Sequence, residues 1–277
     1  MKQAIKATLS RIGLLETAKA ARNGLSTLTT PIRYRGQARQ CRANGIGGGF
    51  PIPPPRLTYL VSGHCDVRGS LANGTKGAKA IADVMEKHGR SIDGLEAVLD
   101  FGCGSGRVIR NWGSLPQGVV HGTDYNQELV DWCSSNLLFA DFSKNELQPP
   151  LRYEDDQFDL IYVLSVFTHL DEELQFSWLR ELLRICRPGG VVLITTHGEK
   201  FYSSLTNEEQ ETWNAGELVV RLGSRSGENA CAIYHPPAYI RETVAPTVGA
   251  EVLDFVPEGA VGNGGQDMWL LKKPLSA

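Results

Sequence analysis

Three glycines stand at alternate positions directly after an apolar run in VLDFGCGSGRVIR, residues 98–110. The apolar run ends at Asp100, and the glycines that follow are Gly102, Gly104 and Gly106. A bare backbone of this kind makes a tight turn between strand and helix, or lets a ligand approach the main chain closely. The pattern departs from the dinucleotide fingerprint G-x-G-x-x-G, because Arg107 stands where its third glycine would fall.

A second acidic residue ends the next apolar run. Asp124 closes the segment HGTD, 20 positions after Gly104. An acid at about this distance accepts hydrogen bonds from both hydroxyls of a ribose, and its charge disfavours a ribose that carries a phosphate. Asp is also well suited to cap the N-terminus of a helix, so both roles stay open for this residue.

The elements around these residues alternate between strand and helix. Apolar runs predict strands at 96–102, 118–124, 158–165 and 191–197, and helices at 75–89, 107–112, 126–136 and 171–186. Two last strands, 250–259 and 267–273, follow one another without a helix and should pair antiparallel at a sheet edge. We therefore predict an α/β fold with a doubly wound, mostly parallel seven-stranded sheet, an antiparallel last strand and an N-terminal helical arm. Ligands of such sheets bind at the carboxyl ends of the strands, where Asp100 is expected.

In this order the segments resemble the class I S-adenosylmethionine (SAM)-dependent methyltransferases, from about residue 94 to 197 and weakly to the end. VLDFGCGSG resembles the SAM-binding loop, and GTDYN resembles the segment with the ribose-binding acid. FDLIYVLSVFTHL resembles the strand that faces the methyl group, and RICRPGGVVLITT resembles the turn and strand that follow. The resemblance implies an enzyme with SAM as its cofactor.

The resemblance also implies cofactor contacts residue by residue. Asp100 would lie near the amino group of SAM, Asp124 would accept from the ribose hydroxyls, and Tyr125 would pack on the adenine. Where the family often has an Asp that meets the adenine amino group, this chain has Asn145, whose amide both accepts and donates hydrogen bonds. The full predicted cofactor-binding set is Asp100, Gly102, Cys103, Gly104, Asp124, Tyr125, Asn145, Leu164 and Ser165. No metal site is predicted.

Methyl transfer is an in-line displacement in which SAM supplies the reactivity and the protein supplies alignment. A base is needed only where the nucleophile arrives protonated, as a hydroxyl does. Three histidines fall where a base could lie, namely His169, His197 and His235. Each has a structural alternative: His169 as part of a helix start, His197 as a core residue and His235 as a turn residue.

Other residues are candidates for contacts beyond this set. Arg68, in the segment 61–70 that is expected to fold over the cofactor, could meet the SAM carboxylate. The aromatic residues Tyr202, Trp213 and Tyr234 of the insertion at 198–235 either line a substrate pocket or, as we favour, form a small core. Gln266 and Asp267 contact substrate or complete a turn.

These observations predict a SAM-dependent methyltransferase that acts on a hydroxyl of a small-molecule or glycan-type acceptor. One alternative is an N-methyltransferase that needs no general base. Another is a SAM-binding regulatory protein without transfer activity. An NAD-dependent oxidoreductase is disfavoured by the missing third glycine of the fingerprint.

Charge is unevenly distributed along the chain. Residues 1–42 hold nine Lys or Arg and one Glu, whereas the net charge of the whole chain is −3, so the rest is acidic. We predict that residues 1–55 form a basic helical arm followed by a Pro/Gly linker, and that the arm contains a helix over 3–22. A methyltransferase domain is predicted to span 56–277. The arm could contact an anionic membrane surface, the body or a second copy in a homo-oligomer. Nucleic acid is not a predicted partner, because the body is acidic.

Cysteine usage and hydropathy bear on location. The six cysteines are scattered without C-x-x-C spacing, which favours reduced thiols in a cytoplasmic protein. No apolar run approaches the length of a membrane span. The predicted location is cytoplasmic, and peripheral on the membrane face if the arm binds lipid.

Overall fold

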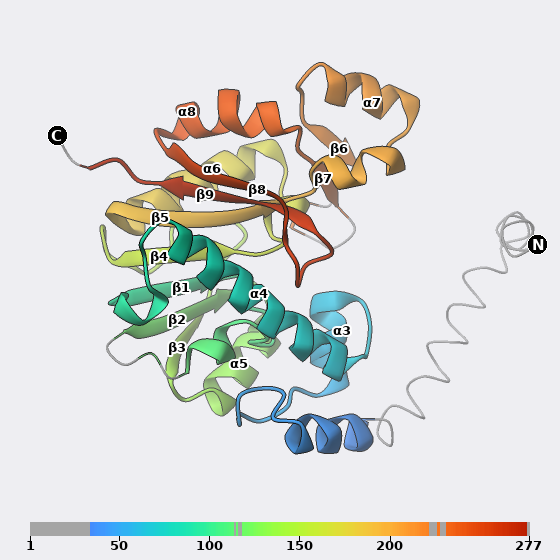
Figure 1. The fold of residues 1–277 in the computed structure, drawn as a ribbon, viewed down its shortest axis with the longest axis vertical. Coiled ribbons are helices and arrows are strands. Elements are labelled where there is room, and N and C mark those ends of the chain that lie inside the picture. Colours follow the sequence, from blue (N-terminus) through green and yellow to red (C-terminus); the bar gives the residue numbers. More distant parts are fainter. Residues whose placement is uncertain (1–33, 114, 116–117, 222–225, 228–230, 276–277) are drawn as a thin grey trace, which may run out of the picture.

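Seven strands form one mixed sheet in the computed structural model, which describes residues 34–113, 115, 118–221, 226–227 and 231–275 (Figure 1). The strand order is β3-β2-β1-β4-β5-β9-β8. The strands are β1 (Ala97–Phe101), β2 (Val119–Asp124), β3 (Ala140–Lys144), β4 (Phe158–Val163), β5 (Cys186–Thr196), β8 (Glu251–Ala260) and β9 (Gln266–Lys272). Strands β1 to β5 pair in parallel, whereas β9 pairs antiparallel with both β5 and β8. This confirms the predicted fold class and the antiparallel end of the sheet.

The α-helices include α3 (Pro55–Ser62), α4 (Val67–Lys87), α5 (Gln127–Asn136), α6 (Glu172–Ile185), α7 (Asn207–Asn214) and α8 (Ala245–Val248). Of these, α4, α5 and α6 pack on the faces of the sheet. Short 3-10 helices are η1 (Ile92–Gly94), η2 (Ile109–Trp112), η3 (Phe167–His169) and η4 (Glu199–Ser204), and η6 (Tyr239–Val244) is a π-helical turn. Helix α4 begins eight residues before the predicted start at 75, because the Asp66 carboxylate accepts a hydrogen bond from Gly69 N (3.0 Å) and caps it there.

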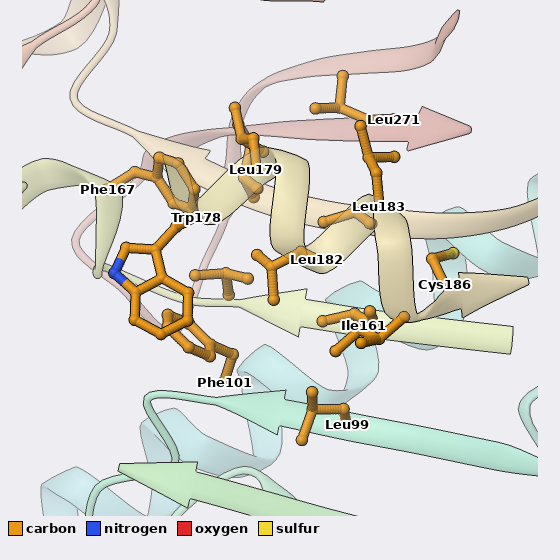
Figure 2. Close-up of a cluster of buried hydrophobic side chains, with 14 of the residues drawn as sticks. Leu99, Phe101, Ile161, Phe167, Trp178, Leu179, Leu182, Leu183, Cys186 and Leu271 are labelled. Atoms are coloured by element: carbon orange, nitrogen blue, oxygen red, sulfur yellow. The ribbon is translucent and has the colours of Figure 1, made fainter. Parts of the chain in front are cut away.

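Apolar side chains alternate along the central strands and fill both faces of the sheet. Leu99 of β1 belongs to the cluster on one face, and Val98 belongs to the cluster on the other. Helix α6 covers the first face, where Trp178 packs on Phe101 with ring centroids 4.7 Å apart (Figure 2). Helices α4 and α5 cover the second face. With both faces buried, the strands are apolar almost throughout.

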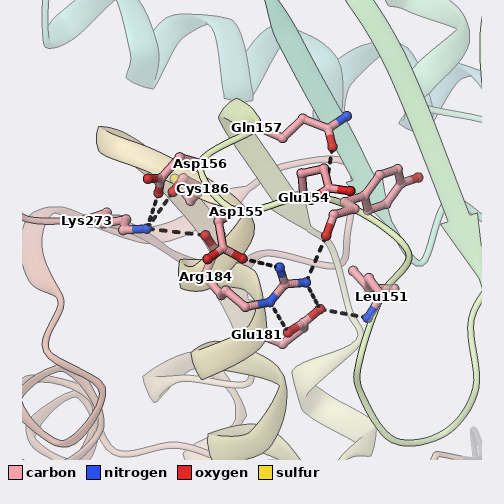
Figure 3. A network of polar contacts seen from close by, with 10 residues as sticks. Leu151, Glu154, Asp155, Asp156, Gln157, Glu181, Arg184, Cys186 and Lys273 are labelled. Carbon is pink, nitrogen blue, oxygen red and sulfur yellow. Dashed lines mark hydrogen bonds and ion pairs between the residues drawn. The ribbon is translucent and has the colours of Figure 1, made fainter.

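A polar network holds the end of α6 where the chain enters β5 (Figure 3). Arg184 donates to both carboxylate oxygens of Glu181 (2.8 and 2.7 Å) and to Asp155 (2.5 Å). Glu181 also accepts from Leu151 N (2.7 Å), and Lys273 donates to Asp156 (2.6 Å). These contacts lie at the amino end of β4, away from the strand ends where the predicted site residues lie.

Some elements differ from the sequence prediction. Strand β3 is absent from that prediction, because in its sequence ADFSK only Phe142 is buried. The helix predicted at 107–112 is reduced to the four residues of η2, because the chain turns at Gly106, whose φ is 71°, and stays in turns up to Val108. Part of the predicted arm and linker packs on α4, where Cys41 and Ile52 share a cluster with Leu71. The helix predicted at 3–22 lies outside the described residues.

The insertion at 198–235 forms a separate small unit. It contains η4, α7 and a two-stranded antiparallel sheet of β6 (Val219–Arg221) and β7 (Ala232–Tyr234) (Figure 1). Trp213 and Tyr234 are buried together in its core, with Tyr202 packed against them, which confirms the small-core interpretation. Across the described part of the chain, no helix combines the length and hydropathy needed to cross a membrane.

Candidate functional site

A cavity of about 590 Å³ opens where β1, β2, β3 and β4 end. Its walls also include parts of α4 and of the turn between β8 and β9. All nine predicted cofactor-binding residues line it, namely Asp100, Gly102, Cys103, Gly104, Asp124, Tyr125, Asn145, Leu164 and Ser165. Of the three candidate bases, His169 lines it and the other two do not.

The glycines of the loop after β1 adopt backbone angles that other residues rarely reach. Gly102, Gly104 and Gly106 have φ of 81°, 56° and 71°. The N–H groups of Gly102 and Cys103 both donate to Thr123 O at the end of β2 (2.8 and 3.0 Å). The loop therefore makes a tight turn and at the same time exposes its main chain to the cavity.

Asp124 is held by the main chain on both of its oxygens. Its Oδ2 accepts from Gly104 N and its Oδ1 from Asn126 N, each at 2.8 Å. Burial raises the pKa of this carboxyl group above its ordinary value, although both backbone hydrogen bonds act against the rise. A carboxylate oxygen accepts more than one hydrogen bond, so both oxygens keep capacity for a ligand in the cavity.

Asp100 is buried at the end of β1 with an incomplete set of partners. Its Oδ2 has no hydrogen-bond partner, and burial raises the pKa of the carboxyl group to about 7. Tyr162 of β4 lowers the pKa of this carboxyl group against the effect of burial, and its hydroxyl accepts from Trp112 Nε1 (2.9 Å). A buried polar atom without a partner is uncommon, and here it belongs to a residue that lines the cavity.

The end of β3 supplies a polar edge to the cavity. Asn145 Oδ1 accepts from Thr123 Oγ1 (2.9 Å), and its Nδ2 donates to Glu146 O (2.8 Å). These bonds fix the orientation of the amide and leave one N–H free to donate. Tyr125, at the end of β2, lines the cavity with 55% of its surface exposed.

Ser165, just past the end of β4, has the left-handed φ of 60°, which is uncommon for a residue with a side chain. Its Oγ donates to Gln266 Oε1 (2.9 Å) and accepts from Asn263 Nδ2 (3.0 Å). Its N–H donates to Thr195 Oγ1 (2.8 Å). The end of β4 is thus tied to β5 and to the β8–β9 turn.

His169 has a defined tautomer. Its Nδ1 lies 2.7 Å from Cys231 O, and a carbonyl oxygen only accepts, so Nδ1 carries the ring proton. The neutral ring then has Nε2 as its unprotonated nitrogen. His169 is half-buried and follows β4 within η3.

The other two histidines pack away from the cavity. His197 Nδ1 lies 3.0 Å from Ile233 O, and burial lowers its pKa to about 4. His235 Nε2 lies 3.0 Å from Gln175 Oε1, and burial lowers its pKa to about 3. Both are packed as neutral side chains. Among the described residues, no group of three or more His, Cys, Asp or Glu side chains could hold a metal ion.

Several residues that line the cavity are not among the predicted ligands. They are Leu60, Val61, Ser62, His64, Ser70, Asn73, Arg107, Glu146, Leu147, Val166, Leu170, Trp178, Gly262, Asn263 and Gly264, among others. The expectation that 61–70 covers the cofactor loop is a partial signal for them, but Arg68 is exposed and does not line the cavity. Gln266 and Asp267 are buried in β9. The turn before them reaches the cavity instead.

Known proteins match the chain in sequence and in fold. Residues 98–190 match a family model described as a methyltransferase domain. The tRNA (carboxymethyluridine(34)-5-O)-methyltransferase of Arabidopsis thaliana is 26% identical over 161 residues, which cover 57% of this chain and 38% of that protein. The mitochondrial ubiquinone biosynthesis O-methyltransferase of Dictyostelium discoideum is 28% identical over 128 residues, which cover 42% and 39%. The matches therefore span about two fifths of these relatives' lengths.

A solved structure of a SAM-dependent methyltransferase from Methanosarcina mazei shares the fold with a TM-score of 0.52 at 18% identity. The superposition covers 69% of this chain and 98% of that one. The family match spans β1 with its glycine loop, Asp124 and the end of β4, all of which line the cavity. Residues 98–190 thus match a methyltransferase domain, and the sheet has the fold of the SAM-dependent methyltransferases, which supports the class I SAM-dependent methyltransferases as the family that the chain resembles.

Proposed function

We propose that this protein transfers the methyl group of SAM to a hydroxyl of a small-molecule or glycan-type acceptor. The observation that carries the proposal is the position and tautomer of His169. The ring lines the same cavity as Asp124 and the glycine loop, and its Nδ1–H is engaged by Cys231 O at 2.7 Å. An imidazole held in this way presents its unprotonated Nε2 as the atom that can accept a proton.

The cofactor residues have separate roles in this proposal. Asp124 binds the ribose hydroxyls, because its two oxygens are already oriented by backbone N–H groups. Asp100 offers the unpartnered Oδ2 to the ammonium group of SAM. Tyr125 packs on the adenine, Asn145 donates to a ring nitrogen, and Gly102 and Gly104 let the main chain approach the methionine part. Cys103, Leu164 and Ser165 complete the surrounding wall.

Bound SAM supplies a methyl group activated by the sulfonium. The protein aligns the acceptor oxygen with the bond between that methyl carbon and the sulfur, because displacement requires an in-line approach. As the oxygen bonds to carbon it loses its proton, which His169 accepts on Nε2. His169 then returns the proton to solvent, and S-adenosylhomocysteine (SAH) is left in the cavity.

The direct test is transfer from SAM carrying a labelled methyl group. The purified protein is incubated with separate panels of phenols, sugars, amines and, because one relative is named for tRNA, bulk tRNA. Label on a phenol or sugar oxygen supports the proposal. Label only on amines, or only on tRNA, overturns it in favour of an N-methyltransferase or a nucleic-acid enzyme.

A binding measurement separates the enzyme from a regulatory SAM-binding protein. SAH is titrated calorimetrically into the same preparation. One-to-one binding with no transfer to any panel would indicate a regulatory SAM-binding protein and count against the enzyme. No binding by folded protein would overturn the assignment of the cavity to the cofactor.

A further inference from the structure

The side chain of Gln175, on α6, holds the backbone on both sides of His169. Gln175 is 2% exposed. Its Nε2 donates to Phe167 O (3.2 Å) and to Leu170 O (2.7 Å), which lie before and after His169 in the chain. Carbonyl oxygens only accept hydrogen bonds, so these two contacts fix which end of the amide carries the N–H groups. The amide oxygen of Gln175 is therefore left for another donor.

That donor is His235, which directly follows β7. Its Nε2 lies 3.0 Å from Gln175 Oε1, and because this oxygen only accepts, Nε2 carries the ring proton. Burial lowers the pKa of the ring to about 3, so the ring is neutral and its Nδ1 is an unprotonated acceptor. This buried Nδ1 has no hydrogen-bond partner among the residues that the structure describes, which costs free energy that an apolar side chain would avoid. The contact with Gln175 therefore needs a reason beyond the packing of this region.

The segment before His235 also holds the ring of His169. Cys231, directly before β7, accepts from His169 Nδ1 through its carbonyl oxygen (2.7 Å). At the other end of β7, the backbone N–H of His235 donates to His197 O (2.9 Å), which anchors the strand beside the end of β5. β7 and η3 are thus joined twice, once through the ring of His169 and once through the pair of Gln175 and His235.

We propose that Gln175 and His235 are positioning residues for His169, whose ring they hold against Cys231 O by joining η3 to β7. The inference rests on the proposed role of His169 as the base. Neither residue of the pair lines the cavity, so both act through His169 and not on a ligand. A base works only within hydrogen-bond reach of the proton that it accepts, and a displacement of about 1 Å can cost roughly 100-fold in rate. With Nδ1–H held by Cys231 O, Nε2 stays the unprotonated nitrogen.

The test reads the ring of His169 without needing an acceptor. NMR spectra of protein with isotopically labelled histidine nitrogens give ring shifts that distinguish the two neutral tautomers. The spectra are recorded for the wild type and for Gln175→Met, His235→Leu and His235→Gln. The signals missing from His169→Ala identify the ring. Transfer rates are then measured with the phenol or sugar that the labelled-methyl panel identifies, and SAH binding is measured calorimetrically.

Gln210 of α7 supplies a matched control for Gln175. Its Nε2 donates in the same way to two carbonyl groups, Tyr202 O (3.5 Å) and Leu205 O (3.2 Å), within the small unit of the insertion. Gln210→Met therefore removes an amide of the same kind without touching η3. Thermal unfolding without ligand checks that each variant is folded.

In the wild type we expect the ring of His169 to be protonated on Nδ1. Gln175→Met and His235→Leu should each move its nitrogen shifts toward those of the Nε2-protonated form and lower the single-turnover transfer rate roughly 10- to 100-fold. SAH binding should stay within about threefold of the wild type, because neither side chain lines the cavity. His235→Gln supplies an amide N–H in place of Nε2–H, so it should retain both the shifts and the rate. Gln210→Met should leave both unchanged.

Other outcomes overturn the inference. If folded Gln175→Met and His235→Leu keep the His169 shifts and the transfer rate of the wild type, the pair only supports the fold. If His235→Gln loses both as His235→Leu does, the Nε2–H donor is not what holds the ring. If His169→Ala transfers methyl groups at the wild-type rate, the proposed function loses its base and the pair loses its role in transfer, even where the shifts show that the pair holds the ring.

Discussion

Replacing Asp124 with Asn tests the assignment of the ribose site with a change of one atom. In the wild-type protein, Oδ1 accepts from Asn126 N and Oδ2 from Gly104 N, each at 2.8 Å. The amide introduced by Asp124→Asn keeps one acceptor oxygen and places an NH₂ group where the second oxygen stood. That NH₂ group faces a backbone N–H, so two donors meet and the loop must shift.

The magnitude follows from the contacts that are lost. One ribose hydroxyl loses its charged acceptor, which costs about 1.5–3 kcal/mol and weakens SAH binding roughly 10- to 150-fold. The unfavourable meeting of two donors costs about 1–3 kcal/mol of folding stability, the usual penalty for a buried group left without its partner. The two effects are separable, because the first requires ligand and the second does not.

Calorimetric titration with SAH measures the first effect, and thermal unfolding without ligand measures the second. Asp131→Asn is the matched control, since Asp131 is an exposed carboxylate on α5 whose contact is to Gln127. SAH binding within about threefold of the wild type in folded Asp124→Asn protein would refute the ribose assignment. If Asp131→Asn also loses SAH binding, the loss in Asp124→Asn reflects the change in net charge and not the ribose contact.

His169→Ala should lower the rate of methyl transfer at least tenfold and leave SAH binding unchanged. Single-turnover rates with labelled SAM measure the transfer step, and an unchanged rate would exclude His169 as the base. Burial holds the pKa of Asp100 at about 7, so binding of the SAH ammonium should favour the carboxylate, release about half a proton at pH 7 and strengthen as the pH rises through 7. Titrations in buffers of different ionisation enthalpy measure the proton, and Asp100→Asn should abolish its release. Burial lowers the folded-state pKa of His235 to about 3, below its ordinary 6.5, so its contribution to stability is complete above pH 6.5 and is lost as the pH falls toward 3. The unfolding temperature should therefore fall less steeply from pH 7 to 4 in His235→Gln than in the wild type, and parallel curves would contradict this.

The sheet and the order of its central elements can be predicted from the sequence. Long apolar runs must be buried on both faces of the sheet. In β1 and β4 these runs end beside polar residues at the carboxyl ends of the strands. The short strand β3 escapes prediction because only Phe142 among its residues is buried. The start of α4 is misplaced because the capping role of Asp66 depends on the three-dimensional path of the chain before it.

The histidines show where local reasoning stops. His169, His197 and His235 each follow or end an apolar segment, and their neighbours in sequence offer no ground for separating them. In the fold, His169 lines the cavity, whereas the other two pack against Ile233 and Gln175. Packing against a distant segment cannot be read from neighbours in sequence, since it is set by how the insertion lies on the sheet.

The fold class, the glycine loop and the acid at the end of β2 are encoded locally, because each depends on residues within one strand-turn-helix unit. Which further residues share the cavity follows only from the folded chain. Arg107 and Asn263 are 156 positions apart, and they meet because β9 runs antiparallel beside β5 and carries its preceding turn back to the carboxyl edge of the sheet. Which side chains meet across this range depends on the path of the turn in the folded chain, and no local pattern encodes that path.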